Sequence, residues 1–337
     1  MFIKNQWYVF CSLQELSARQ PLGKTVCGLP MVAFRGEDGK AGIMLDLCPH
    51  RRAPLSMGKV EGNTLRCIYH GMQFNAQGQC LHIPSQSMIP NKAHVRSFPV
   101  LERYGFLWVW PGEGAGDASL MPSLPWRESP DWNSGLIQYF HVKASYLYMN
   151  DNLLDLSHVA FLHESSIGFD PSLLTEDPLA INITEDRVVS TRCFEDVEQA
   201  PAHRDWFAFP GRVTRLQEAA WSLPARIAVL VRNAADGKEV DLRADHLLTP
   251  ETETSHHYYI ALSRNFRIDD EVLSQRLNEG ALCVHQEDVD IAEAQQRMAL
   301  AVPEARDLPL KADRGMQAAH RIMKGWLEKE GAAARGD

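Results

Sequence analysis

Two short segments, each pairing one cysteine with one histidine, constrain this chain more than any other feature of its sequence. They are Cys48-Pro-His50 and Cys67-Ile-Tyr-His70. Thiolate is a soft metal ligand and imidazole a borderline one, so these four side chains suit an iron–sulfur cluster or zinc. Zinc sites more often begin with two closely spaced cysteines and end with two closely spaced histidines, an order that this sequence does not follow. The pattern therefore favours an iron–sulfur cluster held by two loops.

The Cys-x-His and Cys-x-x-His halves resemble the Rieske [2Fe–2S] signature, in which two histidines replace two cysteines on one iron. Neutral imidazoles leave less negative charge on the cluster, which raises its reduction potential to between about −150 and +300 mV. The chain has seven cysteines, an odd number spread thinly, so we expect no disulfide framework. No comparable partners accompany the other five, which are Cys11, Cys27, Cys80, Cys193 and Cys283.

The charge balance and hydropathy exclude several classes of protein. The chain of 337 residues has 34 Lys and Arg against 43 Asp and Glu, a net charge of −9, which disfavours nucleic acid as a partner. No apolar run approaches the roughly 18–20 residues that span a bilayer. The N-terminus also lacks the features of a signal peptide. We therefore expect a cytoplasmic protein with no membrane partner.

Changes in pattern along the chain predict two domains. Residues 1–115 contain short β-branched and aromatic runs separated by Gly, Pro and Asp, which predicts an all-β domain. Residues 116–124 belong to a Gly-, Pro- and Ser-rich stretch and are expected to form a linker. Residues 125–337 are expected to form an α+β domain with helices on one face of an antiparallel sheet. Its predicted helices cover about 145–164, 269–300 and 314–330, and its strands about 180–194, 226–233, 240–248 and 256–263.

A second group of candidate metal ligands lies in the run DNLLDLSHVAFLH, residues 151–163. Asp151 and Asp155 are four residues apart, and Asp155 and His158 are three apart, so one helix would place all three on one face. His163 lies about 140° around an ideal helix from His158. Both imidazoles can therefore reach one metal only if the helix ends or distorts between them.

A non-haem Fe(II) site with two histidines needs a carboxylate as its third ligand. The predicted helix near 281–298 offers Glu287, Asp288 and Asp290. Asp288 falls within about 30° of the centre of the apolar stripe, whereas Glu287 lies near its edge and Asp290 points away. A carboxylate on a buried stripe is costly unless it is paired or bound to a metal, so Asp288 is the best candidate. The stripe is predicted to consist of Ala281, Val284, Ile291 and Met298.

Together these segments resemble the Rieske non-haem iron oxygenases, over nearly the whole chain. The cluster-binding signature is matched by CPHRRAPLSMGKVEGNTLRCIYHGMQFN, and the mononuclear-iron signature by DNLLDLSHVAFLH. A segment of the single-subunit demethylase branch is matched by LLTPETETSHHYY and SRNF. That branch includes the oxygenase components of vanillate O-demethylase, dicamba monooxygenase and toluenesulfonate methyl-monooxygenase. The fold implied is an N-terminal all-β Rieske domain followed by a C-terminal helix-grip domain.

The resemblance implies two metal cofactors and their ligands. Asp155 would connect His158 to His70 of the partner subunit in a homotrimer, and Asn152 would lie close to the iron. A separate NAD(P)H-dependent reductase would supply electrons, since the chain shows no flavin or nicotinamide motif. The [2Fe–2S] cluster would be bound by Cys48, His50, Cys67 and His70, and the mononuclear Fe(II) by His158, His163 and Asp288.

The activity implied is hydroxylation, with O2, of a methyl or methoxy group of an aromatic acid; a hydroxylated methoxy group collapses to a phenol and formaldehyde. The same two-iron machinery also allows hydroxylation or dioxygenation of another aromatic or cyclic substrate. The resemblance places His246 at a substrate-contacting position. It places Ser222 and Glu279 where the dicamba enzyme has Asn and Trp, so dicamba itself is not expected as the substrate. Arg226 and Arg232 are candidates for binding a carboxylate or sulfonate.

Two other hypotheses remain open at this stage. An electron-transfer protein would use the Rieske cluster alone and would need neither the second domain nor His158, His163 and Asp288. A zinc-binding scaffold would be colourless when purified, whereas a Rieske protein is red-brown and contains iron.

Overall fold

The computed structural model describes residues 2–17, 19–176 and 179–335 and divides into two compact units. The N-terminal unit comprises Phe2–Pro122 together with Thr249–Thr252. The C-terminal unit comprises the other described residues from Ser123 onward. None of the described helices is long and apolar enough to cross a membrane.

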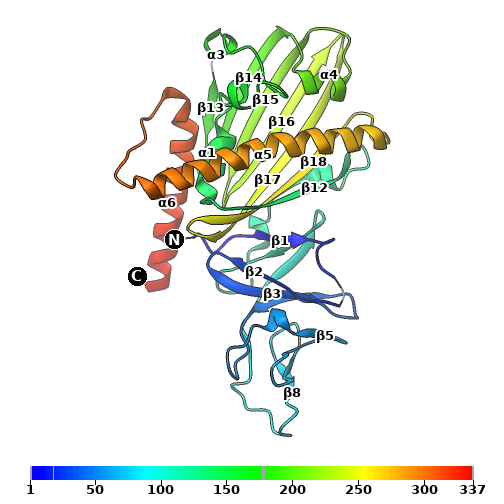
Figure 1. Ribbon diagram of the computed structural model, residues 1–337, viewed down its shortest axis with the longest axis vertical. Coiled ribbons are helices and arrows are strands. Elements are labelled where there is room, and N and C mark those ends of the chain that lie inside the picture. Colours follow the sequence, from blue (N-terminus) through cyan, green and yellow to red (C-terminus); the bar gives the residue numbers. More distant parts are fainter. Residues whose placement is uncertain (1, 18, 177–178, 336–337) are drawn as a thin grey trace. The chain divides into compact units, whose positions relative to one another are not determined.

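The N-terminal unit is built from three small antiparallel sheets (Figure 1). Strand β3 shows why the sequence folds this way, because its successive side chains point to opposite faces. Met31 and Ala33 enter one apolar cluster, while Val32 and Phe34 enter a second cluster that also contains Cys48. The strands, in spatial order, are β1 (Tyr8–Ser12), β11 (Phe106–Val109) and β10 (Val100–Arg103); β2 (Leu22–Val26), β3 (Leu29–Arg35), β4 (Ala41–Leu45) and β9 (Ser97–Phe98); and β5 (Lys59–Glu61), β6 (Thr64–Arg66), β7 (Gln73–Phe74) and β8 (Cys80–His82).

The C-terminal unit has a seven-stranded antiparallel sheet with helices packed against it. Alternate side chains of β14 and β15 are buried, as expected for strands with one covered face. The strands, in spatial order, are β12 (Asn133–Val142), β18 (Ser255–Arg264), β17 (Lys238–Thr252), β16 (Arg226–Ala235), β15 (Val213–Ser222), β14 (Arg187–Val197) and β13 (Ala180–Ile183).

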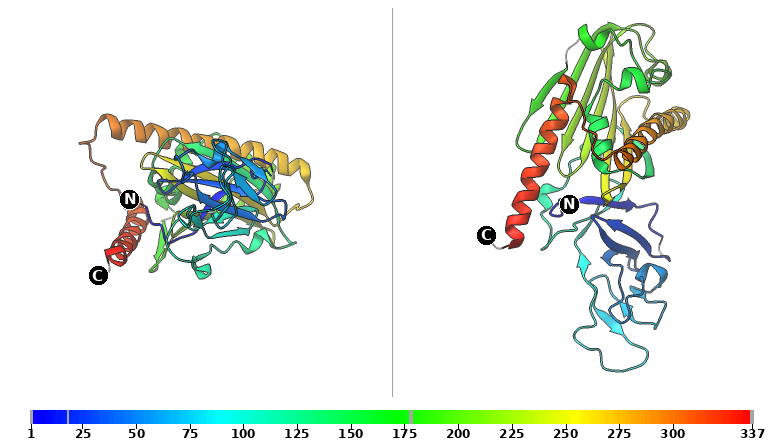
Figure 2. Two further views of the ribbon diagram at one scale, coloured as in Figure 1. Left: turned by 90° about the horizontal axis from the view of Figure 1, so that it is seen from below. Right: turned by 60° about the vertical axis from the view of Figure 1, so that its left-hand side comes forward.

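The long helix α5 (Glu271–Ala301) crosses one face of this sheet (Figure 1). Helix α6 (Arg314–Arg335) runs beside β13 and β14, as Figure 2 shows. The shorter helices are α1 (Tyr146–Leu154), α2 (Val159–Leu162), α3 (Leu173–Glu176) and α4 (Pro201–Phe207). The expected α+β class, with an all-β N-terminal domain, is confirmed.

The single helix predicted over 145–164 is wrong, because it is interrupted. Helix α1 ends at Leu154, and Asp155 forms its C-cap in extended backbone geometry. The Asp155 carboxylate then accepts hydrogen bonds from the Ser157 amide at 2.8 Å and hydroxyl at 2.6 Å, a local alternative to continuing the helix. Asp155 and His158 therefore do not share one helix face with Asp151, contrary to the prediction.

The predicted apolar stripe of α5 is also partly wrong. Ile291 is 39% exposed and Met298 is 62% exposed. Each seven-residue step from Val284 drifts by about 20° around a straight helix, so these two residues leave the buried face. The face that is buried follows steps of three or four residues through Ala281, His285, Asp288, Ala292 and Gln296.

Candidate active site and cluster site

The two Cys–His loops of the N-terminal unit have the same turn geometry. The Arg52 amide donates to the Cys48 carbonyl at 2.9 Å, and the Gly71 amide donates to the Cys67 carbonyl at 3.1 Å. Arg52 and Gly71 both have positive φ, of 60° and 75°. A Cβ on Gly71 would lie 2.9 Å from Pro84 Cγ, so glycine suits both the conformation and the space.

These turns bury the cysteines and expose the histidines. Cys48 and Cys67 are 2% and 1% exposed, whereas His50 and His70 are exposed with ring centroids 4.3 Å apart. Burial, helped by the adjacent Cys67 thiol, raises the pKa of Cys48 to about 11, although the His50 amide acts in the opposite direction. Two adjacent buried sulfurs beside two paired imidazoles are the donor set that a Rieske cluster requires.

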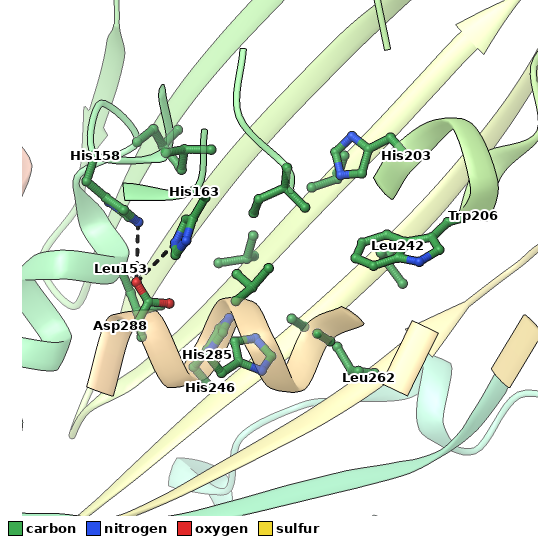
Figure 3. A pocket seen from close by; sticks show the side chains of 18 residues that line it. Leu153, His158, His163, His203, Trp206, Leu242, His246, Leu262, His285 and Asp288 are labelled. Carbon is green, nitrogen blue, oxygen red and sulfur yellow. Dashed lines mark hydrogen bonds and ion pairs between the residues drawn. The ribbon is translucent and has the colours of Figure 1, made fainter. Parts of the chain in front are cut away.

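In the C-terminal unit, one-turn helix α2 brings the two predicted histidines together. His158 precedes this helix and His163 follows it. Potential ligand atoms of His158, His163 and Asp288 all lie within 4.8 Å of one another. Asp288 Oδ1 is 3.1 Å from His163 Nε2 and 3.6 Å from His158 Nε2 (Figure 3).

Hydrogen bonds at Nδ1 of each imidazole fix the orientation in which Nε2 points to the place where the three ligand atoms converge. His158 Nδ1 donates to the backbone carbonyl of Asp155. His163 Nδ1 donates to Glu287 Oε2 at 2.6 Å. Each ring thereby keeps the lone pair of Nε2 for the centre, an arrangement typical of metal-binding histidines. Two lone pairs and a carboxylate that converge in this way fit a divalent iron.

The electrostatics of the three groups reflect how closely they face one another. Burial lowers the pKa of His158, although the Asp288 carboxylate opposes the shift. Burial acts in the same direction on His163, but hydrogen bonds and charges of Asp288 and Glu287 outweigh it, so the pKa of His163 is raised. For Asp288, burial is outweighed by the neighbouring imidazoles, which lower the pKa of its carboxyl. Asn152 Nδ2 donates to Asp288 Oδ1 at 2.7 Å and fixes its orientation.

A cavity of about 110 Å³ extends from these three residues between α5 and the sheet (Figure 3). Cavities of about 150 Å³ bind benzene, so this space is on the scale of one aromatic ring. Leucine, valine and alanine side chains form most of its walls. The polar side chains that line it are His158, His163, His203, His246, His285 and Asp288.

Of the predicted substrate contacts, His246 lines this cavity. Its Nδ1 lies 2.5 Å from Tyr258 Oη, and burial keeps the pKa of His246 well below its usual value, so the ring is neutral. His285 also lines the cavity and was not among the residues predicted from the sequence. Its Nδ1 donates to Gln138 Oε1 at 2.7 Å, and burial lowers the pKa of His285 to about 4. Its spacing of three residues from Asp288 was the available signal, because it shares the buried face of α5.

The other predicted contacts are absent from the described residues that line the cavity. Arg226 Nη2 is 2.9 Å from Asp245, and Arg232 Nε is 2.6 Å from Asp241, so both guanidinium groups already have a carboxylate partner. Ser222 is the last residue of β15, opposite Arg226. Glu279 accepts a hydrogen bond from Gln275 on the exposed side of α5. The prediction that these residues contact substrate finds no support in this geometry.

Comparisons with known proteins agree with both sites. Residues 6–99 match the Rieske [2Fe-2S] domain, and residues 142–329 match the vanillate O-demethylase oxygenase C-terminal domain. The toluene-4-sulfonate monooxygenase system iron-sulfur subunit TsaM1 of Comamonas testosteroni is 32% identical over 98% of each chain. A vanillate O-demethylase oxygenase subunit of Pseudomonas sp. strain HR199 is 35% identical over 99% of this chain and 97% of that one. The crystal structure of dicamba monooxygenase bound to 3,6-dichlorosalicylic acid superposes with a TM-score of 0.93 at 30% identity, covering 98% of this chain and 99% of that one.

A Rieske domain joined to this catalytic domain defines the oxygenase component of a two-part monooxygenase, which receives its electrons from a separate reductase. The chain belongs to the Rieske non-haem iron oxygenases, in the family of the vanillate O-demethylase oxygenase subunits. Its cofactors are a [2Fe–2S] Rieske cluster and a mononuclear non-haem iron. The predictions of family, fold and cofactors are thus confirmed, and the residue-by-residue ligand assignment remains a prediction that the geometry supports.

Proposed function

We propose that this protein hydroxylates a methyl or methoxy group of an aromatic acid. One atom of O2 enters the C–H bond, and the other leaves as water after uptake of two electrons and two protons. The electrons come from NAD(P)H through the separate reductase. A hydroxylated methoxy group then breaks down to a phenol and formaldehyde. Relatives named for vanillate and toluene-4-sulfonate support this substrate class.

The observation that carries the proposal is the position of His158, His163 and Asp288 at one end of a ring-sized apolar cavity. In this proposal these residues hold the iron, and the cluster is held by Cys48, His50, Cys67 and His70. When bound, the iron supplies O2 activation and the cluster supplies electrons. The apolar walls exclude water and orient the aromatic ring, so that the reacting carbon faces the three ligands.

Two further residues are proposed to position these ligands. Asn152 holds Asp288 through a hydrogen bond of 2.7 Å. Glu287 holds His163 through a hydrogen bond of 2.6 Å and selects its Nδ1–H tautomer. Neither side chain needs to touch the substrate for its loss to reduce iron binding.

We further propose that the enzyme works as a homotrimer, with residues 1–115 for electron entry and residues 125–337 for oxygen chemistry. In this arrangement Asp155 connects His158 to His70 of the partner subunit. Asp155 Oδ1 is occupied by Ser157, while its Oδ2 makes no hydrogen bond among the described residues. Its backbone carbonyl accepts from His158 Nδ1. The carboxylate is therefore fixed beside His158 with one oxygen left for a donor from another chain.

A panel of methyl- and methoxy-substituted aromatic acids, supplied to the iron-loaded protein with a matched reductase, tests the substrate class. We expect stoichiometric formaldehyde from a methoxy acid, or a benzylic alcohol from a methyl acid. Product must be measured directly, since uncoupled turnover also consumes O2. Ring oxidation products alone would contradict the proposal. A His158→Ala variant that retained full activity would show that the chemistry lies elsewhere.

A further inference from the structure

At the α4 end of the cavity, the sheet carries a buried arginine that pairs with no carboxylate of the described residues. Arg215 on β15 is 0% exposed. Its Nη2 donates weakly to the Glu198 carbonyl at 3.4 Å, whereas its Nε and Nη1 have no hydrogen-bond partner among the described residues. Burial lowers the pKa of Arg215 only to about 10, with no acidic side chain contributing, so the guanidinium stays charged at neutral pH.

Strand register places Arg215 on the cavity face of the sheet. Gln217 pairs with Val231, and Arg215 pairs with Asn233. Paired residues share a face, and so do residues two apart along a strand. Val231 lines the cavity, and Arg215 and Asn233 form the next layer on the same face, directly beyond the residues that line it. Val213, one layer further along β15, belongs to a buried apolar cluster, which closes this end.

The side chains around Arg215 also have unused hydrogen-bonding capacity. Asn233 is 0% exposed, and neither of its amide atoms has a partner among the described residues. His203 lines the cavity, and its Nδ1 has no hydrogen-bond partner among the described residues. Burial lowers the pKa of the His203 imidazole, and the nearby charge of Arg215 lowers it further. Native proteins rarely leave buried polar groups unpaired, and an uncompensated buried charge is more costly still.

We propose that Arg215, assisted by His203 and Asn233, binds the carboxylate or sulfonate of the aromatic acid substrate. This inference rests on the proposed function and makes it more specific. His203 lies at the end of the cavity away from Asp288 (Figure 3), so the acid group and the reacting carbon occupy opposite ends. The favoured substrates are therefore acids with the methyl or methoxy group para or meta to the acid group, and ortho isomers are disfavoured.

The test compares a charged substrate with its neutral counterpart in the iron-loaded enzyme. The probes are 4-methoxybenzoate and 4-methoxybenzamide, assayed by formaldehyde release with a matched reductase. We expect Arg215→Gln to raise KM for the benzoate by about tenfold or more, as for loss of a charged hydrogen bond, and to leave KM for the benzamide within about twofold. Arg204→Gln is the matched control, because Arg204 is exposed on α4 and already paired with Glu198.

A second measurement does not depend on turnover. We expect 4-methoxybenzoate to raise the Tm of the wild-type enzyme and to have little effect on Arg215→Met. Without ligand, Arg215→Met should melt no lower than wild type, because it removes an uncompensated buried charge. A lower Tm without ligand, or an equal loss of benzoate and benzamide activity, would show that Arg215 is only structural and overturn the proposal.

The regiochemistry and the wild-type control separate this inference from the proposed function. If the wild type oxidises none of the acids, the proposed function fails. If it oxidises them while Arg215→Gln keeps the preference for benzoate over benzamide, only the anion subsite fails. Faster turnover of 2-methoxybenzoate than of the 4-isomer would also contradict the subsite, because its acid group could not reach Arg215 with the methoxy carbon at the iron ligands.

Discussion

At the residue scale, the geometry of the active site depends on the Nδ1 atoms of its two histidines, which point away from the proposed iron position. His158 and His163 are fixed at Nδ1 by two different acceptors, a backbone carbonyl and the Glu287 carboxylate. A backbone carbonyl cannot be changed by substitution, whereas a carboxylate can. Glu287 is therefore the residue at which the orientation of a proposed iron ligand can be tested without touching the ligand.

We predict that Glu287→Gln lowers affinity for the mononuclear iron by about 10–100-fold, because an amide is a weaker acceptor and can present its NH2 to Nδ1. Iron content measured against the visible absorbance of the cluster tests this, since the cluster should be unaffected. The control is Glu279→Gln, the same change at an exposed position of α5. Equal iron content in the two variants would refute the role of Glu287.

The sequence was sufficient to single out His158, His163 and Asp288, because chemical type, spacing and burial periodicity all constrain a metal site. It was not sufficient for Arg215. Arg215 is notable because it has no carboxylate partner among the described residues. That property depends on which strands are neighbours, and β15 was not among the predicted strands. Glu287 was placed at the edge of the buried face, and its contact with His163 required the position of α2.

At the scale of elements, close packing of α5 against α4 shapes one wall of the cavity. A Cβ on Gly280 would lie 2.7 Å from Trp206 Cζ2, and Trp206 is a buried residue that lines the cavity. Gly280 therefore allows α5 to approach the indole closely. At Gly325, in the middle of α6, a Cβ would meet no described atom within 4 Å apart from its chain neighbours and the nearby backbone of its own helix.

We predict opposite effects of alanine at these two glycines. Gly325→Ala should raise stability by about 0.5–1 kcal/mol through helix propensity alone. Gly280→Ala gains the same propensity but must displace the indole, and overpacking costs about 1–3 kcal/mol, so it should lower Tm. Thermal unfolding of the two variants tests this. A similar rise in Tm for both would show that Trp206 moves without cost.

A half-exposed contact links α6 to α1 and should make stability depend on pH. His320 Nε2 lies 2.8 Å from Asp151 Oδ1, and this hydrogen bond raises the pKa of His320. Because the folded pKa exceeds the unfolded value of about 6.5, the stabilisation is complete below that value and is lost as pH rises through the folded pKa.

We therefore predict that His320→Gln lowers Tm more at pH 6 than at pH 8.5. The His320 side chain is 41% exposed, so the difference should correspond to less than about 1 kcal/mol. Asp151→Asn should remove the same pH dependence, which identifies the pair as its source. A His320→Gln effect that is independent of pH would mean that only packing is lost.

The elements that the sequence failed to predict are those imposed by neighbours. Strand β15 has the sequence VTRLQEAAWS, rich in helix formers, and is extended because β14 and β16 pair with it along its length. Metal binding by both histidines required a helix end between His158 and His163, which the end of α2 at Leu162 provides, but the break between α1 and α2 at Asp155 was not predicted. By contrast, α5 and α6 were placed within a few residues, since long periodic segments carry enough local signal.

At the scale of the whole molecule, two metal cofactors in two compact units must exchange electrons. The proposed electron donor is the cluster, whose ligand His70 lies in the N-terminal unit. The proposed electron acceptor is the mononuclear iron, whose ligand His158 lies in the C-terminal unit. Asp155 is the residue proposed to connect them across a subunit boundary. This proposal requires both an assembled trimer and a carboxylate at position 155, and each can be tested independently.

We predict that Asp155→Asn loads both metal centres normally but forms product about 10–100-fold more slowly. The contact of the backbone carbonyl with His158 remains, but the side-chain amide is a weaker acceptor than the carboxylate for His70 of the partner subunit. Metal content, the cluster spectrum and product formation in single turnover should be measured on the same sample. The control is Asp290→Asn, the same change at an exposed carboxylate of α5 that accepts a hydrogen bond from Gln286. Sedimentation should give three chains per particle for the wild type and both variants. A monomeric, fully active wild type would exclude the inter-subunit path, because no neighbouring His70 would be present. Unimpaired turnover by a trimeric Asp155→Asn enzyme would instead retain the assembly and remove Asp155 from the electron path.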